Sequence, residues 1–239
     1  MSTDADHVIR SLVPSLAPRQ LVLALDHAIS FAREDFLEGP SNAKALALIE
    51  RWPDWPDWPD RLAVLVGPEG SGKSHLAAIW AQMTGARILS AKLLGETDLP
   101  HAFATGALVV EDLEPEGLNE RALFHLINMA REQQVDVLLT ARTPPASFVV
   151  SIRDLGSRLR VLPVVALEAP DDALLRQLIV KLAADRQLAV DEALVTYLAN
   201  RIERSFASAR AAIALLDVEA LRQHRPVTRA LAAELFRQP

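Results

Sequence analysis

The fold is decided by the stretch Gly67-Pro68-Glu69-Gly70-Ser71-Gly72-Lys73-Ser74. Its spacing, G-x-x-x-x-G-K-[ST], is typical of a loop that binds phosphate groups. Glycines let the backbone N–H groups curl around an anion, the lysine reaches the β- and γ-phosphates, and the final hydroxyl can hold Mg²⁺. Six residues are therefore expected to bind the phosphates, the last of them also the metal: Gly67, Gly70, Ser71, Gly72, Lys73 and Ser74.

The residues on both sides of this loop have the pattern that the motif requires. The apolar run 62–66 precedes the loop and predicts a strand, and the residues 75–81 that follow it predict a helix. A helix that begins here directs the favourable end of its dipole at the phosphates. A glycine-rich turn without a ligand would need neither Lys73 nor Ser74, and the chain has only four lysines. We therefore predict that the chain binds a nucleotide.

The composition favours an α/β protein and disfavours several classes of function. Of the 239 residues, 50% are hydrophobic but only 5% are aromatic, which suits helices packed over a parallel sheet. No apolar run approaches the roughly 18–20 residues that span a bilayer. The start lacks the pattern of a signal peptide and there are no cysteines, so we expect a cytoplasmic protein without membrane association. The formal net charge of −6 argues against stable direct binding to DNA.

Further apolar runs predict the rest of a parallel sheet. Strands are expected at 86–90, 107–112, 135–140 and 162–167, with helices at 91–95 and 118–132 and a basic turn or short helix at 152–160. From residue 169 strand-like runs cease. The remaining residues predict a small lid of alanine-rich helices, the first capped by Asp171 or Asp172 and the second beginning at Asp191.

Polar residues end two of the predicted strands, where a parallel sheet presents its ligand crevice. Glu111 and Asp112 close the strand at 107–112, and Mg²⁺ prefers oxygen ligands. We expect both acids to take part in metal binding and catalysis; the alternative is a strand that enters solvent through charged residues. Thr140 ends the next strand. It is either a sensor of the γ-phosphate or a plain strand terminator.

A phenylalanine-containing segment and a tryptophan repeat lie before the phosphate loop. The first precedes a predicted helix at 43–50, which Ser41 or Asn42 can cap. The second consists of three Trp-Pro-Asp units at 52–60. Because proline removes a backbone donor and restricts the residue before it, we expect a rigid extended loop there. The alternative is an aromatic docking surface.

The N-terminal region contains a short leucine motif. Residues 1–19 include Pro14 and Pro18 and are expected to form a mobile arm. The stretch Gln20-Leu21-Val22-Leu23 follows and resembles the peptides by which bacterial replication proteins dock on the sliding clamp. In those peptides the glutamine makes polar contacts and the leucines fill an apolar groove. The alternative is an ordinary short strand or helix start.

The order of these parts resembles an AAA+ module, and four short motifs resemble the ATPase domain of the replication initiator DnaA. They are Gly-Pro-Ser-Asn at 39–42, Gly-Lys-Ser-His-Leu at 72–76, Arg-Thr-Pro-Pro at 142–145 and Leu-Gly-Ser-Arg-Leu at 155–159. A short DnaA-like chain with a clamp-binding motif is similar to the Hda family, which inactivates DnaA by promoting hydrolysis of its ATP. The resemblance implies an AAA+ P-loop NTPase fold: a five-stranded parallel sheet flanked by helices, followed by an all-helical lid. The implied divisions are an arm at 1–26, an α/β base at 27–168 and the lid at 169–239.

The resemblance also implies ligands, partners and roles. The expected ligands are ADP (or ATP) with Mg²⁺, and the expected partners are DnaA and the β sliding clamp of DNA polymerase III; self-association is also expected. Arg158 falls where the family places the arginine finger that completes the site of a neighbouring subunit, and Arg153 is expected to make a second interface contact. Four residues are implied to lie at the nucleotide: Phe36, Gly39, Asn42 and His75. Three are implied to bind the clamp: Gln20, Leu21 and Leu23.

Two departures from the family pattern bear on catalysis. The strand ends Glu111-Asp112, whereas a typical AAA+ strand ends Asp-Glu, and the exchange moves each carboxylate by about one methylene. The position of the lid arginine falls near Ala207, with Arg204 and Arg210 three residues to either side. We therefore expect weak or absent hydrolysis by the chain itself. Either Arg204 or Arg210 could substitute for the lid arginine from one helical turn away, and without such an arginine the site would favour ADP over ATP. The rival functions are an autonomous ATPase resembling helicase loaders, and a non-catalytic adaptor at the replication origin.

Overall fold

Five parallel strands form the centre of the structure, a computed structural model that describes residues 31–55 and 61–236. The strands are β1 (Leu62–Val66), β2 (Arg87–Ser90), β3 (Ala107–Leu113), β4 (Asp136–Ala141) and β5 (Val164–Ala166). Their order across the sheet is β2-β3-β4-β1-β5, so the strand before the phosphate loop lies between β4 and β5. The predicted fold class is confirmed.

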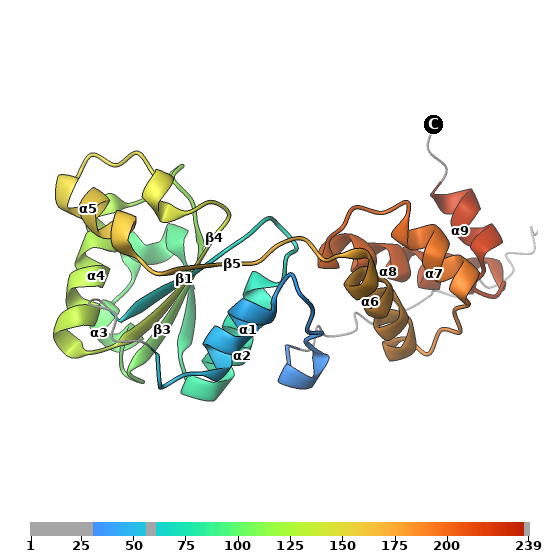
Figure 1. Ribbon diagram of the computed structural model, residues 1–239, viewed down its shortest axis with the longest axis horizontal. Helices are drawn as coiled ribbons and strands as arrows, with labels where there is room; N and C mark the ends of the chain where they lie inside the picture. The colour runs from blue at the N-terminus through green and yellow to red at the C-terminus, as the bar shows by residue number, and fades with distance from the viewer. Residues whose placement is uncertain (1–30, 56–60, 237–239) are drawn as a thin grey trace, which may run out of the picture.

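Helices cover both faces of the sheet (Figure 1). One face carries α1 (Ala43–Glu50) and α2 (Lys73–Thr84); the other carries α3 (Leu99–Ala102), α4 (Glu120–Gln133) and α5 (Arg153–Val161). The short 3₁₀ helices are η2 (Arg33–Asp35), η3 (Ala91–Glu96) and η4 (Pro145–Ser147). The helix predicted at 91–95 is thus a 3₁₀ helix, whereas the predicted helix at 118–132 corresponds to α4.

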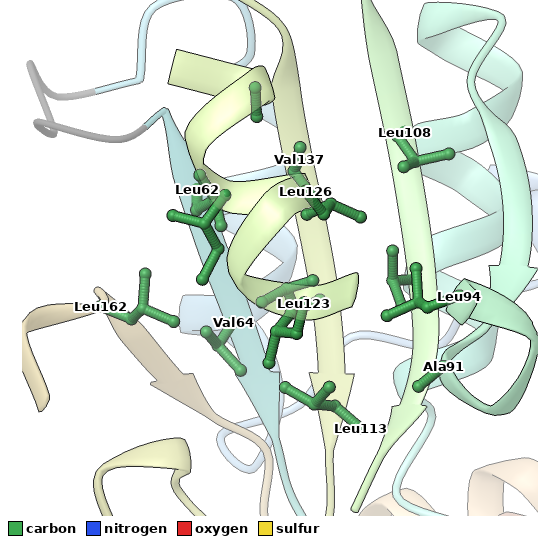
Figure 2. Close-up of a cluster of buried hydrophobic side chains, with 14 of the residues drawn as sticks. Leu62, Val64, Ala91, Leu94, Leu108, Leu113, Leu123, Leu126, Val137 and Leu162 are labelled. Atoms are coloured by element: carbon green, nitrogen blue, oxygen red, sulfur yellow. The ribbon is translucent and has the colours of Figure 1, made fainter. Parts of the chain in front are cut away.

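The packing of α4 shows why this sequence forms a sheet covered by helices. Leu123 and Leu126 of α4 lie over Leu62 and Val137 of the neighbouring strands (Figure 2), and all four side chains are fully buried. Burying each leucine stabilises the fold by about 1.5–3 kcal/mol. The 3.6-residue spacing of apolar residues therefore decides which side of α4 faces the strands.

The C-terminal residues form a separate helical layer with its own core, the lid. It consists of α6 (Asp172–Asp185), α7 (Glu192–Ala199), α8 (Phe206–Gln223) and α9 (Arg229–Leu235). Asp171 caps α6 by accepting from the Leu174 amide at 2.8 Å, and Asp191 caps α7 by accepting from the Leu194 amide at 2.8 Å, as the sequence predicts. Within the described part of the chain, no helix is both long and apolar enough to span a membrane.

The described part of the tryptophan repeat packs against the protein itself. The ring of Trp55 stacks on buried Trp80 with a centroid distance of 5.3 Å, and its Nε1 donates to the Leu48 carbonyl at 2.8 Å. Trp52 meets Trp80 edge-on and donates from Nε1 to Asp136 Oδ2 at 3.0 Å. These two rings seal the core beneath α2, so neither a plain extended spacer nor an outward docking surface describes them. The rest of the repeat, 56–60, lies outside the described residues.

Asp136 joins the repeat to the start of β4, and its loss is predicted to destabilise the fold. Its carboxylate accepts from Trp52 and also from Arg61 Nε and Nη2, both at 2.9 Å. We expect Asp136→Ala to lower the free energy of unfolding by roughly 2 kcal/mol, because hydrogen bonds to charged groups are worth about 1.5–3 kcal/mol. Urea unfolding measures this. Asp54→Ala, which removes an exposed acid from the same repeat, is the matched control and should change stability by less than about 0.5 kcal/mol; equal midpoints for the two variants would contradict the prediction.

Candidate nucleotide-binding site

The phosphate loop connects β1 to α2, and its backbone packs closely against neighbouring residues. A methyl group on Gly67 would lie 2.4 Å from the Leu167 carbonyl oxygen, so only glycine fits there. Gly70 has a φ of +71°, the left-handed region, and a methyl group on it would lie 2.8 Å from Ser205 Cβ in the lid. Lys73 folds back over the loop and donates from Nζ to the carbonyls of Gly67 at 2.7 Å and Pro68 at 2.8 Å.

A cavity of about 340 Å³ lies between this loop and the lid. Eight of the residues predicted to bind a nucleotide or metal line it: Phe36, Gly70, Gly72, Lys73, Ser74, His75, Asp112 and Arg210. Five further lining residues were not predicted: Phe31, Glu69, Arg142, Phe206 and Ala207. Other predicted residues do not line it: Gly67, Ser71, Gly39, Asn42, Glu111, Thr140, Arg153 and Arg158. Gln20, Leu21 and Leu23 lie outside the described residues.

One end of the cavity is aromatic. The rings of Phe31 and Phe36 meet the His75 ring edge-on, with centroid distances of 5.4 and 5.2 Å. His75 Nε2 lies 3.1 Å from the Ala32 carbonyl oxygen. Burial lowers the pKa of His75, which the Ala32 carbonyl and the charge of Asp35 partly oppose. An aromatic, weakly polar lining of this kind suits a purine base.

Asn42 and Gly39 act on this aromatic end indirectly. Asn42 is the N-cap residue of α1, but its side chain makes no capping bond within the helix, contrary to the capping role expected for Ser41 or Asn42. Instead its Oδ1 accepts from the Gly39 amide at 2.9 Å and its Nδ2 donates to the Leu37 carbonyl at 2.9 Å. The side chain therefore fixes the loop that carries Phe36.

A β-bulge at the end of β3 includes both acids, Glu111 and Asp112, and gives their side chains different surroundings. The pairing of β3 with β4 shifts between Val110 and Leu113, and Asp112 has a φ of +56°. The amide of Asp112 donates to Thr140 Oγ1 at 3.0 Å. The extra residue returns Leu113 to the face that packs on α4 and leaves Asp112 at the cavity. Glu111 still pairs with β2, and its buried Oε1 has no partner among the described residues.

Thr140 therefore has a structural role at the end of β4. Its side chain is 1% exposed, it does not line the cavity, and its hydroxyl oxygen accepts the amide of Asp112. Holding that amide stabilises the bulge that selects Asp112 over Glu111. The sequence pattern placed a polar residue correctly at the end of β4 but could not indicate this contact.

Three cations face the cavity. Burial lowers the pKa of Lys73, an effect that the nearby carboxylate of Asp112 opposes and the charge of Arg142 reinforces. Arg142 forms ion pairs of 3.1 Å with Glu69 and with Glu114. Arg210 also lines the cavity, and burial lowers its pKa. Arg204, the other candidate for the lid arginine, pairs with Asp172 at 2.8 Å instead.

Arg158 and Arg153 lie on α5, which is on the far side of the sheet from the lid (Figure 1). The Arg158 guanidinium carbon lies 5.6 Å from the centroid of the Phe124 ring, in the range of a cation–π contact. Glu120, one turn before Phe124 on α4, accepts from the Ser151 and Ile152 amides at 2.9 Å and so holds the start of α5. Arg153 is exposed at the first turn of α5.

Comparison with known proteins identifies the fold. The structure is similar to domain III of the Thermotoga maritima replication initiation protein DnaA, with a TM-score of 0.70 and 18% sequence identity over 87% of this chain and 98% of that one. Against AMPPCP-bound DnaA from Aquifex aeolicus the TM-score is 0.65 at 18% identity, over 80% of this chain and 66% of that one. The Thermotoga maritima RuvB Holliday junction branch migration motor gives 0.65 at 17% identity, over 86% and 70%. The chain has the AAA+ fold. The sequence matches no protein-family model and no curated protein.

The residues of this cavity fit a nucleotide with Mg²⁺. Lys73 and the phosphate loop supply the groups that hold phosphate, and Ser74 and Asp112 supply a hydroxyl and a carboxylate at the same cavity. The described residues contain no cluster of three or more His, Cys, Asp or Glu that could hold a metal alone. This suits Mg²⁺, which is usually held by one or two protein oxygens together with phosphates and water.

The position of His75 predicts a dependence of stability on pH. Because the pKa of His75 is lowered in the folded state, the unfolded chain, with a histidine pKa near 6.5, binds more protons as the pH falls past that value. We therefore expect the free energy of unfolding to decrease between about pH 7 and pH 5 more steeply in the wild type than in His75→Phe, which keeps an aromatic ring. Urea unfolding at several pH values measures the difference. Parallel curves for the two proteins would contradict the prediction.

Proposed function

We propose that this AAA+ protein is a negative regulator of replication initiation that acts on DnaA. It binds ADP (or ATP) with Mg²⁺, docks on the DNA-loaded sliding clamp through Gln20, Leu21 and Leu23, and promotes ATP hydrolysis by DnaA through Arg158. The observation that carries the proposal is the position of Arg158. It lies on α5, outside the lining of its own cavity, while the groups for holding phosphate belong to that cavity.

An arginine in this position has a defined chemical use on another subunit. As the γ-phosphate is transferred to water, negative charge develops on its oxygens, and a guanidinium supplied in trans stabilises that charge. The planar group offers several N–H donors to phosphate oxygens. Arg153 is exposed in the first turn of the same helix, and we propose that it makes a second contact with the same partner.

The chain's own site supports a regulatory role for its nucleotide. Only Asp112 of the two β3 acids lines the cavity, and Glu111 is turned into the fold. A hydrolytic site needs a group that orients water as well as one that holds the metal. A cavity with one carboxylate at this place is better suited to binding a nucleotide than to hydrolysing it.

Docking on the clamp would raise the local concentration of the regulator. A peptide at residues 20–23 connected to the AAA+ base by a short segment makes the encounter with DNA-bound DnaA effectively intramolecular. The requirement for the clamp then limits the activity to DNA on which a clamp has been loaded. The net charge of −6 fits a protein that reaches DNA through such a partner.

Phosphate release from ATP-loaded DnaA tests this function. We expect release to rise only when this protein and DNA-loaded clamp are both present, because an arginine finger can accelerate hydrolysis by about 10³-fold or more. Arg158→Ala and Gln20→Ala should each return release to its unstimulated rate. Arg160→Ala, which removes an exposed arginine of the same helix, is the matched control. Full stimulation by Arg158→Ala would refute the finger and favour an adaptor that tethers its partners.

A second candidate function is an autonomous ATPase. The similarity to the RuvB branch migration motor, with a TM-score of 0.65, favours it, as does a cavity that carries Lys73, Ser74 and Asp112 together. Under this alternative, the chain would hydrolyse its own ATP and Arg158 would serve a neighbouring copy of the same chain.

Turnover by the purified protein separates the two candidates. If the nucleotide is regulatory, phosphate release from ATP by the wild type should not exceed that of Lys73→Ala, at any protein concentration. Turnover that grows with protein concentration and disappears in both Lys73→Ala and Arg158→Ala would instead establish the ATPase, because the site would then be completed between copies.

A further inference from the structure

The lid contains a groove of about 820 Å³ that shares no lining residue with the nucleotide cavity. The groove follows one side of α7 and reaches the start of α9, in the part of the lid that lies far from the sheet (Figure 1). Four residues of α7 line it at helical spacing: Ala193, Thr196, Tyr197 and Asn200. The opposite side of α7 packs into the lid core, so the groove lies on the outer side of the helix.

Two arginines meet one tyrosine beside the last turn of α7. The guanidinium carbons of Arg201 and Arg229 lie 5.2 and 5.8 Å from the centroid of the Tyr197 ring, in the range of cation–π contacts. Arg201 also donates from Nη1 to the Phe236 carbonyl at 3.4 Å. These contacts order both long side chains before a ligand arrives, which lowers the entropy that binding must remove.

Neither arginine has an acidic partner in the part of the chain that the structure describes. Four other arginines of the lid do: Arg186, Arg204, Arg222 and Arg225. Asp191 and Glu192 line the same groove, but they lie at the other end of α7, a helix of eight residues and therefore about 12 Å long. The groove thus has a cationic end and an acidic end.

We propose that this groove binds an acidic peptide segment of a partner protein, with a carboxylate held by the guanidinium groups of Arg201 and Arg229. A guanidinium offers a carboxylate parallel N–H donors, and two such groups held on one ring can share a single acidic side chain. The exposed amide of Asn200, one turn from Tyr197, has both donors and an acceptor and so matches a peptide backbone. The site goes beyond the proposed function, since it involves neither the nucleotide nor Arg158.

The acidic end of the groove favours a peptide over a nucleic acid. A nucleic acid carries a negative charge at every nucleotide, so a strand along the groove would place phosphates beside Asp191 and Glu192. A peptide can instead place a basic residue there. Because an extended chain advances by about 3.3 Å per residue, that basic residue would lie about three or four positions from the acidic one.

Selection from a library of random peptides of about twelve residues, with the full chain as bait, tests the proposal. We expect the selected peptides to carry aspartate or glutamate, with lysine or arginine about three or four positions away. The affinity of the most enriched peptide is then measured by fluorescence anisotropy. Arg201→Gln and Arg229→Gln should each weaken its binding about tenfold, the loss typical of one charge-assisted hydrogen bond. Arg222→Gln, which removes an exposed arginine of α8 outside the groove, is the matched control and should bind as the wild type does.

Several outcomes contradict the proposal. It is wrong if no peptide is enriched, if the enriched peptides lack acidic residues, or if Arg201→Gln and Arg229→Gln bind the peptide as tightly as the wild type. Equal weakening by Arg222→Gln would also overturn it, because the peptide would then respond to the charge of the lid and not to the groove. Displacement of the peptide by an equal concentration of oligothymidylate or inorganic phosphate would replace it with a site for nucleic acid or for a small anion.

Discussion

The close approach of the phosphate loop to the sheet is the constraint on which the rest of the structure depends. The Gly67 amide donates to the Ala141 carbonyl of β4 at 3.2 Å, and the Leu167 amide donates to Val66 at 2.7 Å. The loop thereby begins while still bonded to both neighbours of β1, and the absence of a side chain at Gly67 lets the Leu167 carbonyl come within contact. The carboxyl ends of three strands are held around one point. Lys73, Asp112 and Arg142 lie at or just beyond the strand ends and owe their positions in the cavity to this geometry.

The bulge at Asp112 shows how a small backbone irregularity decides the chemistry of such a site. In a regular strand successive side chains alternate between the faces of the sheet, so Glu111 and Asp112 would point in opposite directions. The bulge keeps Leu113 in the core and turns Asp112 to the cavity, at the cost of a left-handed backbone that Thr140 supports through the Asp112 amide. The order of the two acids matters less than which one the bulge selects.

The sequence was sufficient for the layers of the fold and for part of the site. Apolar runs identified the three central strands, β1, β3 and β4, because the middle of a parallel sheet is buried on both faces. The edge strands β2 and β5 are shorter and partly exposed. The phosphate loop is defined by spacing alone. The sequence did not indicate which distant parts of the chain contact each other. Trp52 and Trp55 lie in a proline-rich repeat whose composition suggests a spacer, yet they pack on Trp80. The local pattern around Arg142 likewise does not indicate that its side chain pairs with Glu69.

The lid contacts the cavity through the first residues of α8. Phe206, Ala207 and Arg210 at the start of α8 all line the cavity, and the Phe206 amide donates to the Gly70 carbonyl at 2.9 Å. Lys181 of α6 also pairs with Asp35 at 2.6 Å, beside the aromatic end. A nucleotide therefore contacts the lid and the base at once. It can shift the balance between lid positions only by binding one of them more tightly, and the surface shown to a partner follows from that difference in affinity.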